Sequence, residues 1–150
     1  MNLADPNDYK KFYSHKFNKA ALRYELAVSV FDNKLISMNG PFPAAKNDAA
    51  IYKEGLLGKL TDQEKVIADR GYRGCPKAST PNGYDNIELR KFKTRARQRH
   101  ETFNGRIKAF QCLANPFRQH FSLEKHQSVF EAVCVIVQYK LEHGSPLFDA

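Results

Sequence analysis

Cysteine is scarce in this sequence, and its three copies, Cys75, Cys112 and Cys134, lie far apart. An odd number of cysteines without a CxxC pair is not typical of a disulfide framework or a zinc site. It favours free thiols in a reducing, intracellular compartment. We expect Cys112 and Cys134, which fall on apolar helix faces, to lie in the core.

Long apolar runs are also lacking. The longest one spans only residues 132–137, far short of the roughly 18 residues that a membrane helix needs. The sequence therefore predicts no membrane partner. It also contains no P-loop, no GxGxxG and no Ser-His-Asp order, which argues against the functions that these motifs mark. With 150 residues, of which 42% are hydrophobic, the chain is the right size for one folded domain.

Acidic residues are almost absent from one segment of the chain. Residues 90–108 hold eight basic side chains and a single acid, Glu101, so this segment carries +7 of the net charge of +8. Concentrated positive charge favours a polyanionic partner, with nucleic acid as the leading candidate. A solvated basic face on a helix has the same signature, and the charge pattern alone leaves both interpretations open.

The first third of the chain has the pattern of a β-hairpin. Apolar and polar residues alternate over 22–30, Asp32 and Asn33 supply a turn, and residues 34–38 form the returning strand. We expect residues 40–43, Gly-Pro-Phe-Pro, to end this strand because proline cannot donate a hydrogen bond to a ladder.

The remaining chain predicts one short strand and several helices, which together indicate an α/β fold with a mixed sheet flanked by helices. The expected elements are a helix capped by Asn47 or Asp48, a strand over 65–68, a loop over 75–86, a helix bearing Phe103, Ile107 and Phe110, and a helix from Ser122 to Gly144.

Two acids occupy positions that packing does not require. Asp69 follows the apolar run 66–68, at the carboxyl end of a predicted strand, where ligand sites cluster in open α/β sheets. Glu101 lies roughly 160° around its helix from Phe103, and so faces away from the core. Its expected neighbours on that face are basic or polar: Arg97, Asn104 and Lys108.

Each acid has an ordinary structural explanation when taken alone. Asp69 with Gly71 can begin a turn, and Glu101 can pair with basic neighbours one helical turn away. Taken together, two convergent carboxylates suit a hard divalent ion such as Mg²⁺, which supports phosphodiester displacement. The surrounding arginine and lysine side chains would then hold the nucleic-acid backbone.

Five segments in order resemble one family, the DDE superfamily endonucleases, and more narrowly the PIF/Harbinger-type transposases. They are YSHKFNKAALRYELAVSV (13–30), NGPFPAAKNDAAIY (39–52), EKVIADRGYRG (64–74), RHETFNGRIKAF (99–110) and HQSVFEAVCVIVQYKLEHGSPLF (126–148). The resemblance implies an RNase H-like fold in which three acids bind two divalent ions, Mg²⁺ or Mn²⁺, for cleavage and transfer of DNA strands.

The resemblance also implies roles for particular residues. Asp69, in DRGY, and Glu101, in HETFNGRIK, match the family's second and third catalytic, metal-binding acids. Asp48, in KNDAAIY, matches an acid that suits a helix cap or the wall of the site. DNA is the implied partner, a separate accessory DNA-binding protein is a second one, and the nucleus is the implied location. The side chains expected to contact DNA are Arg95, Arg97, Arg99, Asn104 and Lys108.

The match departs from the family at the first acid. That aspartate belongs to a first strand, in a segment resembling Asp-Gly-Thr, and residues 1–12 contain no such strand. We therefore expect a polar N-terminal stub over 1–12 and a partial catalytic domain over 13–148, with the first strand missing. Two functions remain open: a metal-dependent DNA endonuclease or transposase core with impaired activity, or a non-catalytic remnant that binds DNA or protein through its basic helix.

Overall fold

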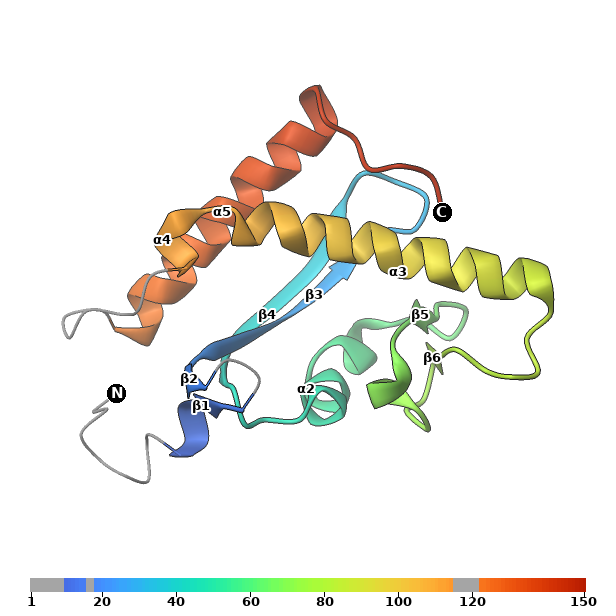
Figure 1. The fold of residues 1–150 in the computed structure, drawn as a ribbon, viewed down its shortest axis with the longest axis horizontal. Coiled ribbons are helices and arrows are strands. Elements are labelled where there is room, and N and C mark those ends of the chain that lie inside the picture. The colour runs from blue at the N-terminus through green and yellow to red at the C-terminus, as the bar shows by residue number, and fades with distance from the viewer. Residues whose placement is uncertain (1–9, 16–17, 115–121) are drawn as a thin grey trace.

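The computed structural model describes residues 10–15, 18–114 and 122–150, and it confirms the α/β class (Figure 1). Within these residues the strands pair in three two-stranded ladders, where a mixed sheet was expected: β1–β2 and β3–β4 are antiparallel, and β5–β6 is parallel. The elements are β1 (Tyr13–Ser14), β2 (Lys19–Ala20), β3 (Leu22–Val28), β4 (Leu35–Pro43), α2 (Asp48–Glu54), the 3₁₀ turn η1 (Leu56–Lys59), β5 (Val66–Ile67), the 3₁₀ turn η2 (Arg70–Tyr72), β6 (Ala78–Ser79), α3 (Ile87–Lys108), α4 (Gln111–Ala114) and α5 (Leu123–His143).

The predicted hairpin is present as β3 and β4, but β4 does not stop at the prolines. It continues to Pro43, which pairs with Leu22. Proline is tolerated there because, among the described residues, β4 pairs with β3 alone, so its other edge needs no hydrogen-bond donors. Gly40 lies within this stretch at φ 138°, and a Cβ on it would be only 2.7 Å from Cδ1 of Tyr24.

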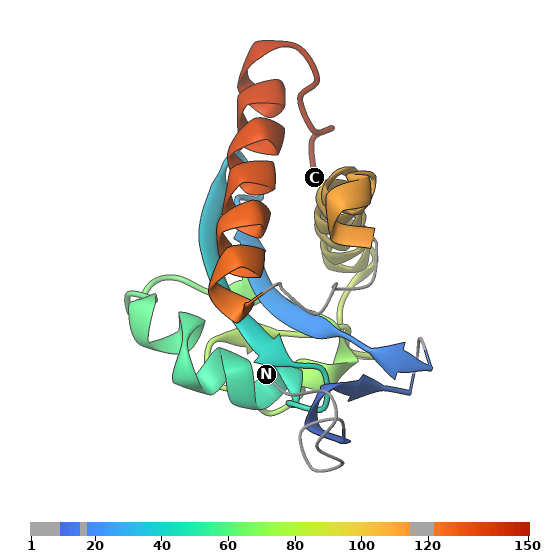
Figure 2. The ribbon, with the colours of Figure 1, turned by 90° about the vertical axis from the view of Figure 1, so that its left-hand side faces the viewer.

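The hairpin separates two layers of helix. Tyr24 and Leu26 of β3 pack into the core formed with α3 and α5. The alternate residues Arg23 and Glu25 point the other way, toward α2 and η1, as expected for a strand with period two. Figure 2 shows α5 upright along the hairpin, with α3 nearly end-on beside it.

The main core lies between α3 and α5, and it confirms the predicted helical stripe. Phe103 and Ile107 of α3 are buried against Phe130 and Val137 of α5. Ser122 begins α5 as expected, since its hydroxyl accepts a hydrogen bond from the backbone N–H of Lys125 at 3.2 Å.

The predicted burial of the thiols is half correct. Cys134 is buried inside α5, whereas Cys112 is exposed. The expectation for Cys112 was wrong because α3 ends at Lys108 and a separate four-residue helix, α4, carries Cys112. The apolar face of α3 therefore does not extend to Cys112.

Two elements differ from the sequence expectation in the region before the basic helix. The expected loop over 75–86 contains β6, which pairs with β5 through Val66–Ala78 and Ile67–Ser79. The side-chain oxygen of Asn86 accepts from the N–H of Leu89 at 2.8 Å and starts α3 at Ile87. The whole basic segment 90–108 is therefore one helix.

The expected N-terminal stub is only partly visible, because residues 1–9 lie outside the described part. Residues 10–12 form a helical turn, and Phe12 is buried, so the end of the stub belongs to the folded domain. Within the described ranges, no helix has the length and apolar character required to cross a membrane.

Candidate functional site

Asp69 lies directly beyond β5, where the backbone turns into η2. The N–H of Ala68 donates to the carbonyl of Ser79 at 3.1 Å, which fixes the strand up to this point. Oδ1 of Asp69 then accepts from the N–H of Gly71 at 2.8 Å. A Cβ on Gly71 would lie 3.0 Å from that oxygen, so glycine leaves room for the hydrogen-bonded carboxylate. The side chain is exposed, oriented by the turn and open to a ligand.

Tyr72, three residues later in the same DRGY motif, marks where several acids gather. Burial raises the pKa of its phenol, and the negative charges of Asp48, Glu25 and Asp69 raise this pKa further. The phenol ring packs edge-to-face on Tyr52, with ring centroids 5.7 Å apart. All three carboxylates therefore act on the Tyr72 phenol.

Asp48 is held by an ion pair on that side. Its Oδ1 accepts from Nη1 of Arg23 at 2.7 Å. The capping role in α2 goes to Asn47, whose side-chain oxygen accepts from the N–H of Ala49 at 2.7 Å. Asp48 therefore does not cap the helix, and the pair with Arg23 occupies one of its oxygens.

Glu25 is a buried carboxylate beneath this region. Burial raises the pKa of Glu25, while the backbone N–H of Leu56 and the amide of Asn39 lower it. A Cβ on Gly55 would lie 3.0 Å from Oε2 of Glu25. Glu25 is thus enclosed by the start of η1 and is shielded from solvent.

Glu101 projects from the outer face of α3, as the helical geometry predicted. It is exposed, whereas Phe103 is fully buried on the opposite side. The preceding residue, His100, is held against β3: its Nε2–H donates to the carbonyl of Leu26 at 3.1 Å, and Nδ1 accepts from the amide of Asn104 at 3.3 Å. Burial lowers the pKa of His100, and its hydrogen bond to Leu26 fixes the helix against the hairpin.

Arg99 is the clearest departure from the expected DNA-contacting set. It is only 2% exposed. Its guanidinium donates to the carbonyls of Ser29 at 3.2 Å and Asp32 at 2.6 Å, to that of Phe148, and to Oδ1 of Asn33 at 3.3 Å. Arg99 ties α3 to the hairpin turn and to the C-terminal segment, and its charge does not reach the surface.

The other four members of that set have different surroundings. Arg95 donates twice to the carbonyl of Asp149, at 3.0 and 2.7 Å, and Asn104 is engaged by His100. Lys108 is exposed, and Arg97 is half-buried. Within the described part of the chain, neither Arg97 nor Lys108 has a hydrogen bond or ion pair through its side chain.

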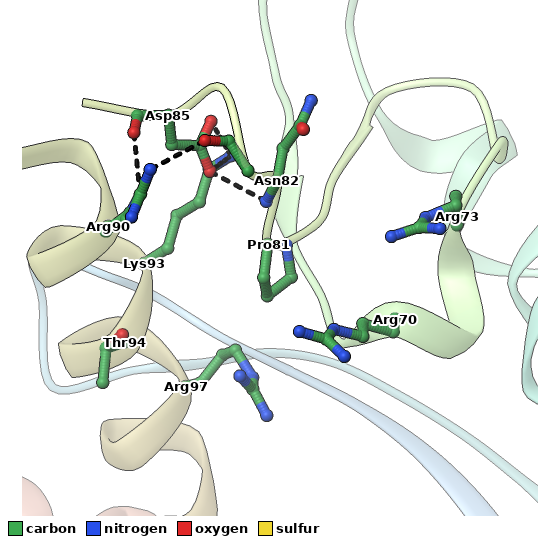
Figure 3. Close-up of a pocket in the computed structure, with 10 residues that line it drawn as sticks. Arg70, Arg73, Pro81, Asn82, Asp85, Arg90, Lys93, Thr94 and Arg97 are labelled. Carbon is green, nitrogen blue, oxygen red and sulfur yellow. Dashed lines mark hydrogen bonds and ion pairs between the residues drawn. The ribbon is translucent and has the colours of Figure 1, made fainter. Parts of the chain in front are cut away.

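A basic cavity of about 320 Å³ lies between η2, the loop over 81–85 and the N-terminal half of α3 (Figure 3). Guanidinium groups of Arg70 and Arg73 face it from η2 and its end, and Arg97 faces it from α3. The charge count over 90–108 missed Arg70 and Arg73, which are far away in the sequence. The only signal for them was the motif DRGYRG itself.

The cavity is lined by a residue close in sequence to each candidate acid. Arg70 directly follows Asp69, and Arg97 precedes Glu101 by four residues, about 6 Å along the same face of α3. Arg70 and Arg97 both line the cavity, whereas Asp69 and Glu101 are not among its lining residues. The helix that carries Glu101, α3, also packs against β5, the strand that precedes Asp69.

The chemistry of this donor set fits a hard divalent ion. Asp69 and Glu101 are exposed carboxylates on separate elements, and their oxygens are of the kind that Mg²⁺ accepts, since Mg²⁺ is commonly held by one or two carboxylates plus water and substrate phosphates. Across residues 10–15, 18–114 and 122–150, no group of three or more histidine, cysteine, aspartate or glutamate side chains is arranged to hold a metal ion.

The model of one protein family, described as DDE superfamily endonuclease, matches residues 1–138 of the 150. The chain belongs to the DDE superfamily endonucleases. No curated protein matches it, and no solved structure does so either. Membership of this endonuclease family supports a nuclease- or transposase-type function with DNA as the substrate, and DDE superfamily endonucleases generally use divalent metals.

Proposed function

We propose that this DDE superfamily endonuclease is a metal-dependent core for cleavage of DNA phosphodiester bonds, of the transposase type. In this proposal Asp69 and Glu101 are the catalytic acids that hold Mg²⁺ or Mn²⁺. The observation that carries the proposal is the shared cavity: Arg70, which follows Asp69, and Arg97, one helical turn before Glu101, face the same space.

Each residue has a distinct task in this proposal. The turn with Gly71 orients Asp69, and one of its oxygens stays available. Glu101 is kept outward because Phe103 anchors the opposite face of α3. The bound ion would polarise the phosphodiester and activate the attacking water, while the arginine side chains neutralise the phosphate charge. Asp48, paired with Arg23, forms part of the wall without coordinating the ion.

The arrangement of elements supports an RNase H-like frame. An antiparallel hairpin with helices on both faces and an acid at the end of a neighbouring short strand is compatible with that architecture. We further propose that the domain spans 13–148, that an accessory DNA-binding protein supplies site recognition, and that the protein acts in the nucleus.

Nicking of supercoiled plasmid tests this function. Wild-type protein with Mg²⁺ or Mn²⁺ should convert the plasmid to the open-circular form, and chelation should stop the reaction. Asp69→Asn and Glu101→Gln should each reduce the rate by at least a hundredfold, because neither amide supplies the ligand charge. Glu88→Gln, on the exposed first turn of the same helix, is the matched control and should keep the wild-type rate.

Two results would overturn the proposal. One is nicking that persists equally in Asp69→Asn, since the activity would then come from other residues or from a contaminant. The other is an absence of metal-dependent nicking by wild-type protein. In the second case, tight and salt-sensitive DNA binding would favour the non-catalytic remnant, whose basic helix binds DNA without cutting it.

A further inference from the structure

We infer that the arginine cavity binds one unpaired nucleotide of single-stranded DNA, with its phosphate among Arg70, Arg73 and Arg97 and its base stacked on Tyr84. This inference deepens the proposed function. The claim that the nucleotide lies beside a cleavage site rests on that function. Binding itself requires no metal, and it is measured separately.

The first support is three guanidinium groups without a protein partner. Within the described residues, the side chains of Arg70, Arg73 and Arg97 make no hydrogen bond or ion pair, although all three line the same cavity. Like charges gathered around one space repel each other unless an anion lies between them. A guanidinium matches a phosphate through two parallel N–H donors, so phosphate is the anion that this geometry suits.

The second support is a wall built by the remaining basic residues. Lys93 and Asp85 form a buried ion pair, with side chains 7% and 10% exposed and an Nζ–Oδ2 distance of 2.9 Å. The Lys93 ammonium lowers the pKa of Asp85. Arg90 donates to the carbonyls of Asp85 at 2.8 Å and Gly83 at 2.7 Å. Arg90 and Lys93 therefore fix the loop, and the three other arginines remain for a ligand.

The third support is an aromatic ring on that fixed loop. Tyr84 is 97% exposed and does not itself line the cavity, but its two neighbours in the loop, Gly83 and Asp85, do. Its backbone N–H donates to the side chain of Asn82 at 3.2 Å. A solvent-exposed aromatic beside a positively charged groove is the usual platform on which a base of a single strand stacks.

The size and shape of the cavity favour an unpaired nucleotide over a duplex. Its volume of about 320 Å³ is at the lower end of the range for small-molecule pockets, roughly 300–1,000 Å³. In a duplex the bases are stacked inside the helix, so only phosphates would reach the rim. An unpaired nucleotide presents both its phosphate and the face of its base, which matches three arginines and one tyrosine.

Fluorescence anisotropy with a short labelled oligothymidylate, and with the same strand paired to its complement, tests this inference in EDTA. Arg70→Ala/Arg73→Ala/Arg97→Ala should weaken single-strand binding more than tenfold. It should also lower the slope of log affinity against log salt by about 0.7, the value for loss of one phosphate contact of a single strand. The matched control replaces three exposed lysines outside the cavity: Lys34→Ala/Lys53→Ala/Lys125→Ala.

Tyr84 gives the sharper readout because it carries no charge. Tyr84→Ala should weaken single-strand binding by about five- to a hundredfold, the range for loss of one base–aromatic stack. Tyr84→Phe should keep wild-type affinity, and neither variant should change binding of the duplex. Thermal unfolding of each variant checks that the fold is intact. Neither change should destabilise the fold, because the Tyr84 side chain is exposed.

The inference is overturned if Tyr84→Ala binds the single strand as tightly as Tyr84→Phe, or if the lysine control loses as much affinity as the arginine variant. An equal loss for single strand and duplex also overturns it. Because EDTA removes the metal, these failures are independent of cleavage. Plasmid nicking without this binding pattern would reject the nucleotide site alone, and the binding pattern without nicking would reject the proposed function alone.

Discussion

Replacing Arg99 with alanine should strongly destabilise the protein. The side chain is 2% exposed and donates four hydrogen bonds to groups outside α3. Hydrogen bonds that involve a charged group contribute about 1.5–3 kcal/mol each, but they are not additive. Removing one partner of a buried charged network typically costs about 3–5 kcal/mol, so we expect Arg99→Ala to lower the free energy of unfolding by about 4 kcal/mol.

Urea denaturation followed by circular dichroism measures this loss directly. Total stabilities of single domains are about 5–15 kcal/mol, so the midpoint of Arg99→Ala should fall greatly at an unchanged slope. Arg99→Lys should recover less than half of the loss because an ammonium cannot reproduce the planar fork. Arg97→Ala, on the same helix and half-buried without a partner among the described residues, is the control and should change stability by no more than about 0.5 kcal/mol.

The opposite result would return Arg99 to the DNA-contacting set. If Arg99→Ala unfolds at the same urea concentration as Arg97→Ala, and DNA binding weakens more in Arg99→Ala, then the guanidinium acts at the surface. The structural account of its burial would be wrong.

Three further predictions follow from buried or crowded positions. Burial lowers the pKa of His100, so on acidification this histidine is protonated in the unfolded chain before it is protonated in the folded protein, and the free energy of unfolding should fall as pH drops below about 6.5. Denaturation at a series of pH values should show a smaller loss of stability in His100→Gln than in the wild type. An identical loss would count against this prediction. Burial raises the pKa of the Cys134 thiol to about 11. A thiol reagent at mildly alkaline pH should therefore label exposed Cys112 before Cys134. Labelling of both cysteines at the same rate in the native state would disprove this prediction. Gly40→Ala should lower the free energy of unfolding by about 1–3 kcal/mol, because alanine would have an unfavourable φ and its Cβ would contact the ring of Tyr24. An unchanged denaturation midpoint would contradict this prediction and show that the strand relaxes freely.

Local patterns were sufficient to predict the elements whose burial is regular. The alternation over 22–30 predicted β3, and the spacing of Phe103 and Ile107 predicted the buried face of α3. The position of Glu101 opposite Phe103 followed from helix geometry alone. These features depend on neighbours within a few residues, so the sequence contains them directly.

The features that the sequence did not predict depend on distant partners. The short strand β6 becomes visible only through its pairing with β5. Arg99 has the same local pattern as Arg97, and only the carbonyls of the hairpin turn and the C-terminal segment distinguish the two. The cavity joins Arg70 and Arg73 to Arg97 across more than twenty residues of intervening chain, which no charge count along the sequence detects.

The most direct test of the central claim is a double-mutant cycle on Mn²⁺ affinity, measured by electron paramagnetic resonance with single-stranded DNA present. If Asp69 and Glu101 hold one ion together, then Asp69→Asn and Glu101→Gln should each weaken Mn²⁺ binding at least tenfold. The double variant should bind little worse than either single variant, because one substitution already breaks the shared site. Affinity losses that simply add, or Mn²⁺ binding unchanged in both single variants, would contradict a common metal site beside the arginine cavity.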